Sequence, residues 1–159
     1  MTDIQTIGVV GAGQMGSGIA QVASATGYGV MMTDIDDAAL ERGLGAVRKS
    51  LGRLVRKERM TSAEADAVVS RIQTSTSIAA VADCQLVVEA ATENVDLKLR
   101  IFGDIAATCG EDTILATNTS SISITKIAAV TNRPDNVIGM HFMNPVPVMK
   151  LVELIRGLA

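Results

Sequence analysis

The sequence has few aromatic residues, no tryptophan and two cysteines among its 159 residues. Proteins that bind single-stranded nucleic acid stack bases on aromatic side chains, so an aromatic content of 2% disfavours that function. A formal net charge of −3 also argues against a broadly basic surface for phosphate backbones. Cys84 and Cys109 are too few for a disulfide framework and lack the spacing of metal ligands. We therefore expect reduced core thiols, no nucleic-acid partner and no metal site.

Long hydrophobic runs and targeting signals are also missing. No apolar stretch approaches the roughly 18 residues that span a bilayer, and residues 1–5 contain neither a basic nor an apolar signal segment. Hydrophobic residues make up 48% of the chain and charged residues 19%, which excludes intrinsic disorder. The length suits one domain with a sizeable core. These features predict a cytoplasmic, single-domain protein that makes no contact with membranes.

The chain alternates short apolar runs with amphipathic segments. The runs predict strands at residues 4–10, 29–33, 85–90, 113–117 and 137–142, and residues 151–155 form a last apolar run before Gly157. The periodic segments predict helices at residues 17–26, 37–59, 61–72, 95–108 and 123–130. Such alternation is typical of an α/β fold, and we expect a doubly wound, mostly parallel sheet with helices on both faces.

A glycine-rich turn follows the first predicted strand and opens the first helix. Its sequence is GAGQMG at residues 11–16, and Asp34 ends the next strand 23 residues after Gly11. Gly11 permits a tight turn, Gly13 lets the backbone approach a pyrophosphate, and Gly16 allows close packing of helix and strand. The helix N-terminus then offers unpaired N–H groups to phosphates. This context predicts a Rossmann-type dinucleotide site, to which the turn contributes Gly11, Gly13, Gln14, Met15 and Gly16.

Asp34 predicts which dinucleotide binds there. A carboxylate accepts hydrogen bonds from the hydroxyls of the adenine ribose but repels a 2′-phosphate, and no arginine follows Asp34 directly. The sequence therefore favours NAD over NADP as the cofactor. The alternative is a plain tight turn beside a solvated aspartate.

Half of the chain's cations lie in one predicted helix. Residues 41–59 carry seven Lys or Arg residues and two Glu residues, whereas the whole chain is net acidic. Ser50 and Lys57 lie two helical turns apart beside the apolar stripe, so a hydroxyl and an ammonium together could bind a phosphate-bearing substrate. The alternative is a solvated helix face, which is what most charge runs are.

The only histidine, His141, ends an apolar strand, where open α/β sheets bind their ligands. Asn144 follows in a proline-containing turn. Glu153 lies in the last apolar run, where a carboxylate is costly to bury unless it is paired. A glutamate beside an imidazole fixes its tautomer and stabilises the imidazolium that forms when it accepts a proton. These residues predict acid–base chemistry; the alternative is a structural role, which is commoner for a lone histidine.

Two other predicted strand ends carry polar residues at the same edge. One is the segment 118–121, which could orient a substrate or could cap the next helix through Ser120, Ser121 or Ser123. The other is Glu93 with Asn94, which could face the cofactor or could form a solvated helix start. Lys98 follows Glu93 by five residues and could reach the same crevice.

Four segments together resemble the NAD-binding domain of the L-3-hydroxyacyl-CoA dehydrogenase family, which includes bacterial 3-hydroxybutyryl-CoA dehydrogenases. They are GAGQMGSGIAQ at 11–21, residues 88–93 with Lys98, ATNTSS at 116–121, and GMHFMNPVPVMKLVE at 139–153. The last segment is highly specific, and the resemblance extends over essentially the whole chain. It implies the oxidation of (S)-3-hydroxyacyl-CoA to 3-ketoacyl-CoA in fatty acid metabolism, and the reverse reduction of acetoacetyl-CoA.

The resemblance also implies a role for each candidate residue. His141 is the general base that removes the 3-hydroxyl proton, and Glu153 orients it. The substrate and cofactor near C3 are lined by Ser120 and Asn144. The roles implied for the remaining residues are contact with NAD for Asp34, Glu93 and Lys98, and contact with coenzyme A for Ser50 and Lys57.

Family members continue into a helical second domain that closes the substrate cleft and forms a dimer interface. The resemblance therefore implies that residues 1–159 are the NAD-binding domain alone, taken from a homodimeric parent. We expect this chain to bind NAD, to show weak or no turnover by itself, and to expose an apolar face. Two other hypotheses stay open, namely an NAD-binding module without catalysis and a dehydrogenase of another β-hydroxy acid.

Overall fold

One seven-stranded sheet organises the computed structural model, which describes residues 3–159. Its strands are β1 (Thr6–Val10), β2 (Gly29–Thr33), β3 (Ile72–Ser75), β4 (Leu86–Glu89), β5 (Ile114–Thr117), β6 (Val137–Phe142) and β7 (Val152–Arg156). The helices are α1 (Gln14–Ala25), α2 (Asp37–Arg56), α3 (Ser62–Ser70), α4 (Val95–Thr108) and α5 (Ile124–Ala128), with short 3₁₀ turns η1 (Ile78–Val81) and η2 (Pro134–Asn136).

The strand order is β3-β2-β1-β4-β5-β6-β7. All neighbours pair in parallel except β6 and β7, which are antiparallel. The chain runs outward from β1 to β3 and then returns to β4 on the other side of β1. This arrangement confirms the predicted doubly wound, mostly parallel sheet. It also creates a topological switch point between β1 and β4, where folds of this type bind their ligands.

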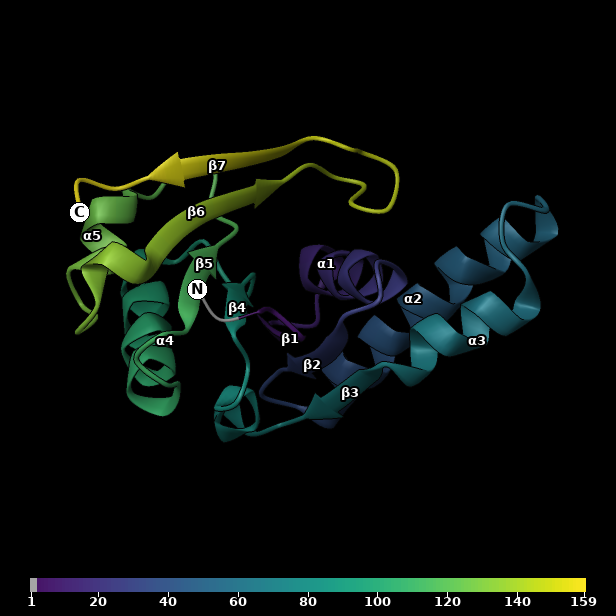
Figure 1. Ribbon diagram of the computed structural model, residues 1–159, viewed down its shortest axis with the longest axis horizontal. Coiled ribbons are helices and arrows are strands. Elements are labelled where there is room, and N and C mark those ends of the chain that lie inside the picture. The colour runs from purple at the N-terminus through teal and green to yellow at the C-terminus, as the bar shows by residue number, and fades with distance from the viewer. Residues whose placement is uncertain (1–2) are drawn as a thin grey trace.

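Two hydrophobic cores lie on opposite faces of the sheet. Because side chains alternate along a strand, Val9 and Val88 pack on one face against α1 and α2, while Val10 and Val87 pack on the other against α4 and α5. Figure 1 shows α1, α2 and α3 grouped at one end of the molecule and α4 and α5 at the other. Helices therefore cover both faces, as the sequence predicts.

The third strand was not expected from the sequence. The prediction of a helix over residues 61–72 is correct at its start, where Thr61 and Glu64 form the reciprocal capping box, but wrong at its end. The helix stops at Ser70, and Ile72 begins a strand whose residues pair with β2 in the register Val30↔Ile72. Only Ile72 of this short edge strand is buried, so its sequence carries little strand pattern.

The helix predicted over residues 37–59 ends earlier, at Arg56. Glu58 adopts a left-handed conformation with φ 56°, and the amides of Glu58 and Arg59 donate to the carbonyls of Val55 and Leu54. This is the Schellman pattern, which normally places glycine at the left-handed position. Smaller differences affect the other elements: α1 starts at Gln14 rather than residue 17, and α5 ends at Ala128 rather than residue 130.

The apolar run at 151–155 forms β7, the last strand in the sheet order. All residues of β7 are exposed, including Leu154 at 64%. The apolar residues Val148, before the strand, and Leu158, after it, are 71% and 92% exposed. Figure 1 shows the loop between β6 and β7 extending across the top of α1. Within residues 3–159, no helix is both long and apolar enough to cross a membrane.

Candidate active site

The glycine turn after β1 meets the loop after β4 at the switch point. Gly11 has φ +108°, and a Cβ there would lie 2.8 Å from the carbonyl oxygen of Ala90. A Cβ at Gly16 would lie 1.9 Å from the carbonyl oxygen of Gly11, so helix and turn are in direct backbone contact. A Cβ at Gly13, in contrast, would meet no atom within 4 Å. Two glycines thus close the turn, and the third leaves open space beside the N-terminus of α1.

Asp34 lies against this turn. Its Oδ2 accepts a hydrogen bond from the amide of Ala12 at 2.8 Å, and its Oδ1 accepts from the amide of Ile35 at 2.7 Å. An ionised carboxylate offers about four acceptor positions, so about two remain free. The side chain is half-buried. Asp34 can therefore both hold the turn and accept hydrogen bonds from a ligand.

A cleft of about 430 Å³ runs from the glycine turn along α2. Helix α2 contributes Ser50, Arg42 and Arg53 to its lining, and the β6–β7 loop contributes Asn144. Gly13 and Gln14 lie at its other end, beside Ser17 of α1. Lys57 is exposed and follows the end of α2, outside the residues that line this cleft. The structure thus brings Ser50, but not Lys57, together with Asn144 and the turn.

His141 and Glu153 face each other across the β6–β7 hairpin. They are opposite residues in the antiparallel register, and Nδ1 of the imidazole lies 2.9 Å from Oε2 of the carboxylate. His141 is 23% exposed and Glu153 is 52% exposed, so solvent reaches the pair. If Nδ1 donates to the carboxylate, the lone pair of the imidazole is at Nε2. The arrangement provides an oriented base at the carboxyl end of β6.

Two contacts hold this hairpin at the ligand-binding edge. Val146 of the β6–β7 loop is buried against α1, where a Cβ on Gly18 would lie 2.8 Å from the Cβ of Val146. Asn118, at the end of β5, accepts a hydrogen bond at its Oδ1 from the amide of Phe142, 2.8 Å away. The residue after His141 is therefore tied to the loop that carries Ser120.

The structure separates helix caps from candidate ligand-binding residues. Ser123 caps α5 by accepting from the amide of Lys126 at 3.3 Å, whereas Ser120 is exposed and has no capping role. Asn94 caps α4 in the same manner. Glu93 is exposed and accepts a hydrogen bond from the buried hydroxyl of Thr119 at 2.9 Å.

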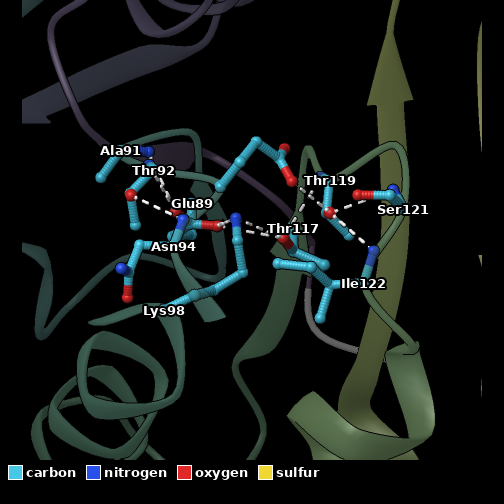
Figure 2. A network of polar contacts seen from close by, with 10 residues as sticks. Glu89, Ala91, Thr92, Asn94, Lys98, Thr117, Thr119, Ser121 and Ile122 are labelled. Atoms are coloured by element: carbon cyan, nitrogen blue, oxygen red, sulfur yellow. Dashed lines mark hydrogen bonds and ion pairs between the residues drawn. The ribbon is translucent and has the colours of Figure 1, made fainter. Parts of the chain in front are cut away.

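Lys98 and Glu93 both line a smaller cleft of about 170 Å³, which Met15 and Asn118 border as well. The ammonium of Lys98, however, forms an ion pair with Glu89, a residue that the sequence analysis missed. Figure 2 shows Lys98 reaching from α4 toward Glu89 at the end of β4 and Thr117 at the end of β5. The sequence did carry one signal for Glu89, because this acid ends a continuous apolar strand. A buried carboxylate needs a partner, so its position predicts a nearby cation or hydrogen-bond donor.

Cys84 and Cys109 are buried and unbonded to each other, as expected for core thiols. Burial, followed by the neighbouring Cys109 and Asp83, raises the pKa of the Cys84 thiol to about 11. Burial likewise raises the pKa of Cys109. Both groups stay protonated near neutral pH, which argues against a nucleophilic role.

This geometry agrees with comparisons to known proteins. A family model described as "3-hydroxyacyl-CoA dehydrogenase, NAD binding domain" matches residues 6–159. The chain belongs to this family. As its NAD-binding domain, it takes NAD as its cofactor.

The relatives that the chain matches are longer than the chain itself. A probable 3-hydroxybutyryl-CoA dehydrogenase of Bacillus subtilis is 52% identical over 157 residues, which cover 99% of this chain and 55% of the relative. A 3-hydroxyadipyl-CoA dehydrogenase of Escherichia coli is 43% identical, covering 100% of this chain and 34% of the relative. The crystal structure of (S)-3-hydroxybutyryl-CoA dehydrogenase from Ralstonia eutropha superposes with a TM-score of 0.97 at 55% identity, covering 98% and 55% of the two chains.

The residues of the glycine turn fit NAD. The open space at Gly13 lets a phosphate group approach the backbone at the N-terminus of α1. The free acceptor positions of Asp34 suit ribose hydroxyls, and the next residues, Ile35 and Asp36, supply no cation for a 2′-phosphate. The chemistry of the donor and acceptor set therefore matches the cofactor of the family.

Proposed function

We propose that the protein carrying this chain is an NAD-dependent 3-hydroxyacyl-CoA dehydrogenase, which oxidises an (S)-3-hydroxyacyl-CoA to the 3-ketoacyl-CoA and catalyses the reverse reduction. The observation that supports this best is the His141–Glu153 pair, with Nδ1 and Oε2 2.9 Å apart at the carboxyl end of β6. The pair lies at the same sheet edge as the glycine turn. A base and a dinucleotide site at one edge suit removal of a hydride and a proton from one alcohol.

His141 is the base in this proposal. Glu153 accepts a hydrogen bond from Nδ1–H and so leaves the lone pair of Nε2 free to take the proton of the 3-hydroxyl group. The imidazolium that forms is stabilised by the carboxylate beside it. When bound, NAD supplies the acceptor for the hydride that leaves C3. Ser120 and Asn144, both exposed at this edge, orient the oxygen at C3.

The cofactor is held by the turn and by the β4 edge. The backbone of the turn and the N-terminus of α1 bind the phosphates, and Asp34 binds the adenine ribose. Glu93 lies along the remainder of the cofactor through the smaller cleft, and Lys98 lines the same cleft while its ammonium pairs with Glu89. The residues proposed for the turn are Gly11, Gly13, Gln14, Met15 and Gly16.

Coenzyme A binds along α2 in this proposal. Ser50 lines the larger cleft with Arg42 and Arg53, so a hydroxyl and two guanidinium groups face a phosphate-bearing substrate. Lys57 adds a cation at the outer end of the helix. A homodimer formed through a second, helical domain and a cytoplasmic location complete the proposal for the parent protein.

An assay of the parent protein tests the base. With acetoacetyl-CoA and NADH, we expect His141→Ala to lower kcat by ~10²–10⁴-fold, the usual contribution of a general base. NAD affinity measured by calorimetry should remain near the parent value, because the imidazole does not hold the cofactor. Unchanged turnover in His141→Ala would remove the assigned base. Tight NAD binding without any acyl-CoA reduction would favour a non-catalytic module.

Carboxylates introduced at Ser50 and Lys57 test the substrate class. Ser50→Glu and Lys57→Glu should each raise KM for a CoA thioester about tenfold, because both place a carboxylate near phosphates. Lys49→Glu is the matched control, because Lys49 is exposed, does not line the cleft and lies about 100° around the helix from Ser50. Lys57, in contrast, follows Ser50 by two helical turns on the same side. If all three variants keep the parent KM, the substrate is a β-hydroxy acid without coenzyme A.

A further inference from the structure

The carboxyl ends of β4 and β5 share a buried polar cluster, which we call the Glu89 network (Glu89, Lys98 and Thr117). These side chains are 0%, 1% and 0% exposed. They join three elements, since Glu89 ends β4, Thr117 ends β5, and Lys98 lies in the first turn of α4. Figure 2 shows the three side chains converging beside the loop that follows β4.

The two carboxylate oxygens of Glu89 have different hydrogen-bond partners. Oε1 pairs with the ammonium of Lys98 and accepts a hydrogen bond from the hydroxyl of Thr117 at 3.0 Å. Oε2 accepts from the backbone amides of Ala91 and Thr92 at 2.9 and 3.4 Å. The Lys98 ammonium also donates to Thr117 at 3.3 Å. One side of the carboxylate therefore balances a charge, and the other side holds the loop backbone.

Stability alone does not account for this arrangement. Replacing a buried ion pair with well-packed apolar residues is often neutral or stabilising, because desolvation of the two charges offsets their attraction. The loop amides supply another reason for the carboxylate. Ala90 and Ala91 pack against the glycine turn, where a Cβ on Gly11 would lie 2.8 Å from both the Ala90 oxygen and the Ala91 Cα. The same loop leads to Glu93 and lines the smaller cleft.

We propose that Glu89 is a positioning residue for NAD: its carboxylate fixes the loop at residues 90–93 against the glycine turn, so that the cofactor cleft exists before the cofactor arrives. Glu89 acts through the Ala91 and Thr92 amides and is itself fully buried. A loop ordered in advance lowers the entropic cost of binding and so raises affinity. This proposal rests on the binding of NAD by the domain.

Two double variants of this chain isolate the role of the loop anchor. Both carry Lys98→Met, so that neither retains a buried unpaired ammonium, and they differ only at position 89. Glu89→Gln keeps an oxygen for the Ala91 and Thr92 amides, whereas Glu89→Met has similar size and offers only a thioether sulfur, a weak acceptor. We expect the Glu89→Gln/Lys98→Met protein to bind NAD at least tenfold more tightly in calorimetry than Glu89→Met/Lys98→Met. Equal affinities of two folded variants would overturn the proposal.

Amide hydrogen exchange of the unaltered chain gives a test that does not depend on the folding of any variant. In the absence of NAD, we expect the Ala91 and Thr92 amides to exchange at least a hundredfold more slowly than in an unstructured peptide. Unprotected amides that become protected only when NAD is added would show that the cofactor orders the loop, and would overturn the proposal. A failure to bind NAD at all would instead contradict the assigned cofactor, whatever the exchange rates.

Discussion

Gly13 and Gly16 differ in what a methyl group would meet. We expect Gly16→Ala to unfold or strongly destabilise the chain, because its Cβ would lie 1.9 Å from the carbonyl oxygen of Gly11. Gly13→Ala should fold, because its Cβ would meet no protein atom within 4 Å, with a loss of at most ~1 kcal/mol at a helix N-cap. The same methyl group would occupy the space that a pyrophosphate needs.

Urea unfolding and NAD calorimetry of the two alanine variants check this prediction. Gly13→Ala should keep a cooperative transition and lose at least tenfold in NAD affinity, which corresponds to about 1.4 kcal/mol. A Gly13→Ala protein that binds NAD like the unaltered chain would show that the phosphates lie elsewhere. A Gly16→Ala protein of unchanged stability would contradict the close backbone contact.

Residues were predictable where their chemistry has a strict spacing. The glycine turn with Asp34 is one such pattern. His141 and Glu153 were predicted to pair from a carboxylate in the last apolar run, with their roles implied by the family resemblance. The antiparallel return of the chain places them opposite each other. Glu89 was not predicted, because its partner Lys98 comes from a different element, and the spacing of nine residues has no meaning until the fold joins them.

At the scale of elements, the side chain of Arg133 caps the C-terminus of α4. Its guanidinium donates to the carbonyl oxygens of Ala106 at 2.6 Å and Cys109 at 3.1 Å, and also to that of Gly110. These carbonyls have no partner within the helix, since the last turn lacks following amides. A cation at this end also interacts favourably with the helix dipole.

We therefore expect Arg133→Ala to lower the free energy of unfolding by about 1.5–3 kcal/mol, the usual effect of losing hydrogen bonds to a charged group. Urea denaturation gives the value. Arg100→Ala is the control, because Arg100 is exposed on the same helix, and we expect a change within about 0.5 kcal/mol. Similar losses for both variants would show that Arg133 does not cap the helix.

Helix ends show what the sequence can and cannot predict at this scale. Gly27, with φ +110°, ends α1 in a Schellman pattern, and a glycine after an apolar segment predicts such an end. Glu58 ends α2 with the same hydrogen bonds, but glutamate has a high helix propensity. Strand β3 was missed for a related reason, because its pairing with β2, rather than its own composition, makes it a strand.

For the molecule as a whole, the exposed apolar surface around β7 is the region where we expect self-association. β7 is the last strand of the sheet, and Leu154 and Leu158 are 64% and 92% exposed. Exposed apolar edge strands pair with other chains. We expect the 159-residue chain to self-associate as its concentration rises, which sedimentation velocity would detect.

Leu154→Lys should weaken this association, because a charged side chain on an edge strand opposes pairing. Val130→Lys is the matched control, since Val130 is 43% exposed and follows α5 rather than β7. A wild-type chain that stays monomeric at all concentrations would contradict the prediction, as would equal effects of the two lysines.

The fold class was predictable at this scale, because alternating strands and helices permit few topologies.

The proposed reaction requires the imidazole of His141 to face the nicotinamide half of the bound cofactor. His141 is the only histidine in the chain, so its imidazole proton signals can be assigned directly by NMR. We expect saturation with NAD to shift these signals markedly, and saturation with ADP-ribose, which lacks nicotinamide, to leave them nearly unchanged. Signals that do not move when NAD is bound, or that move equally with both ligands, would contradict the account.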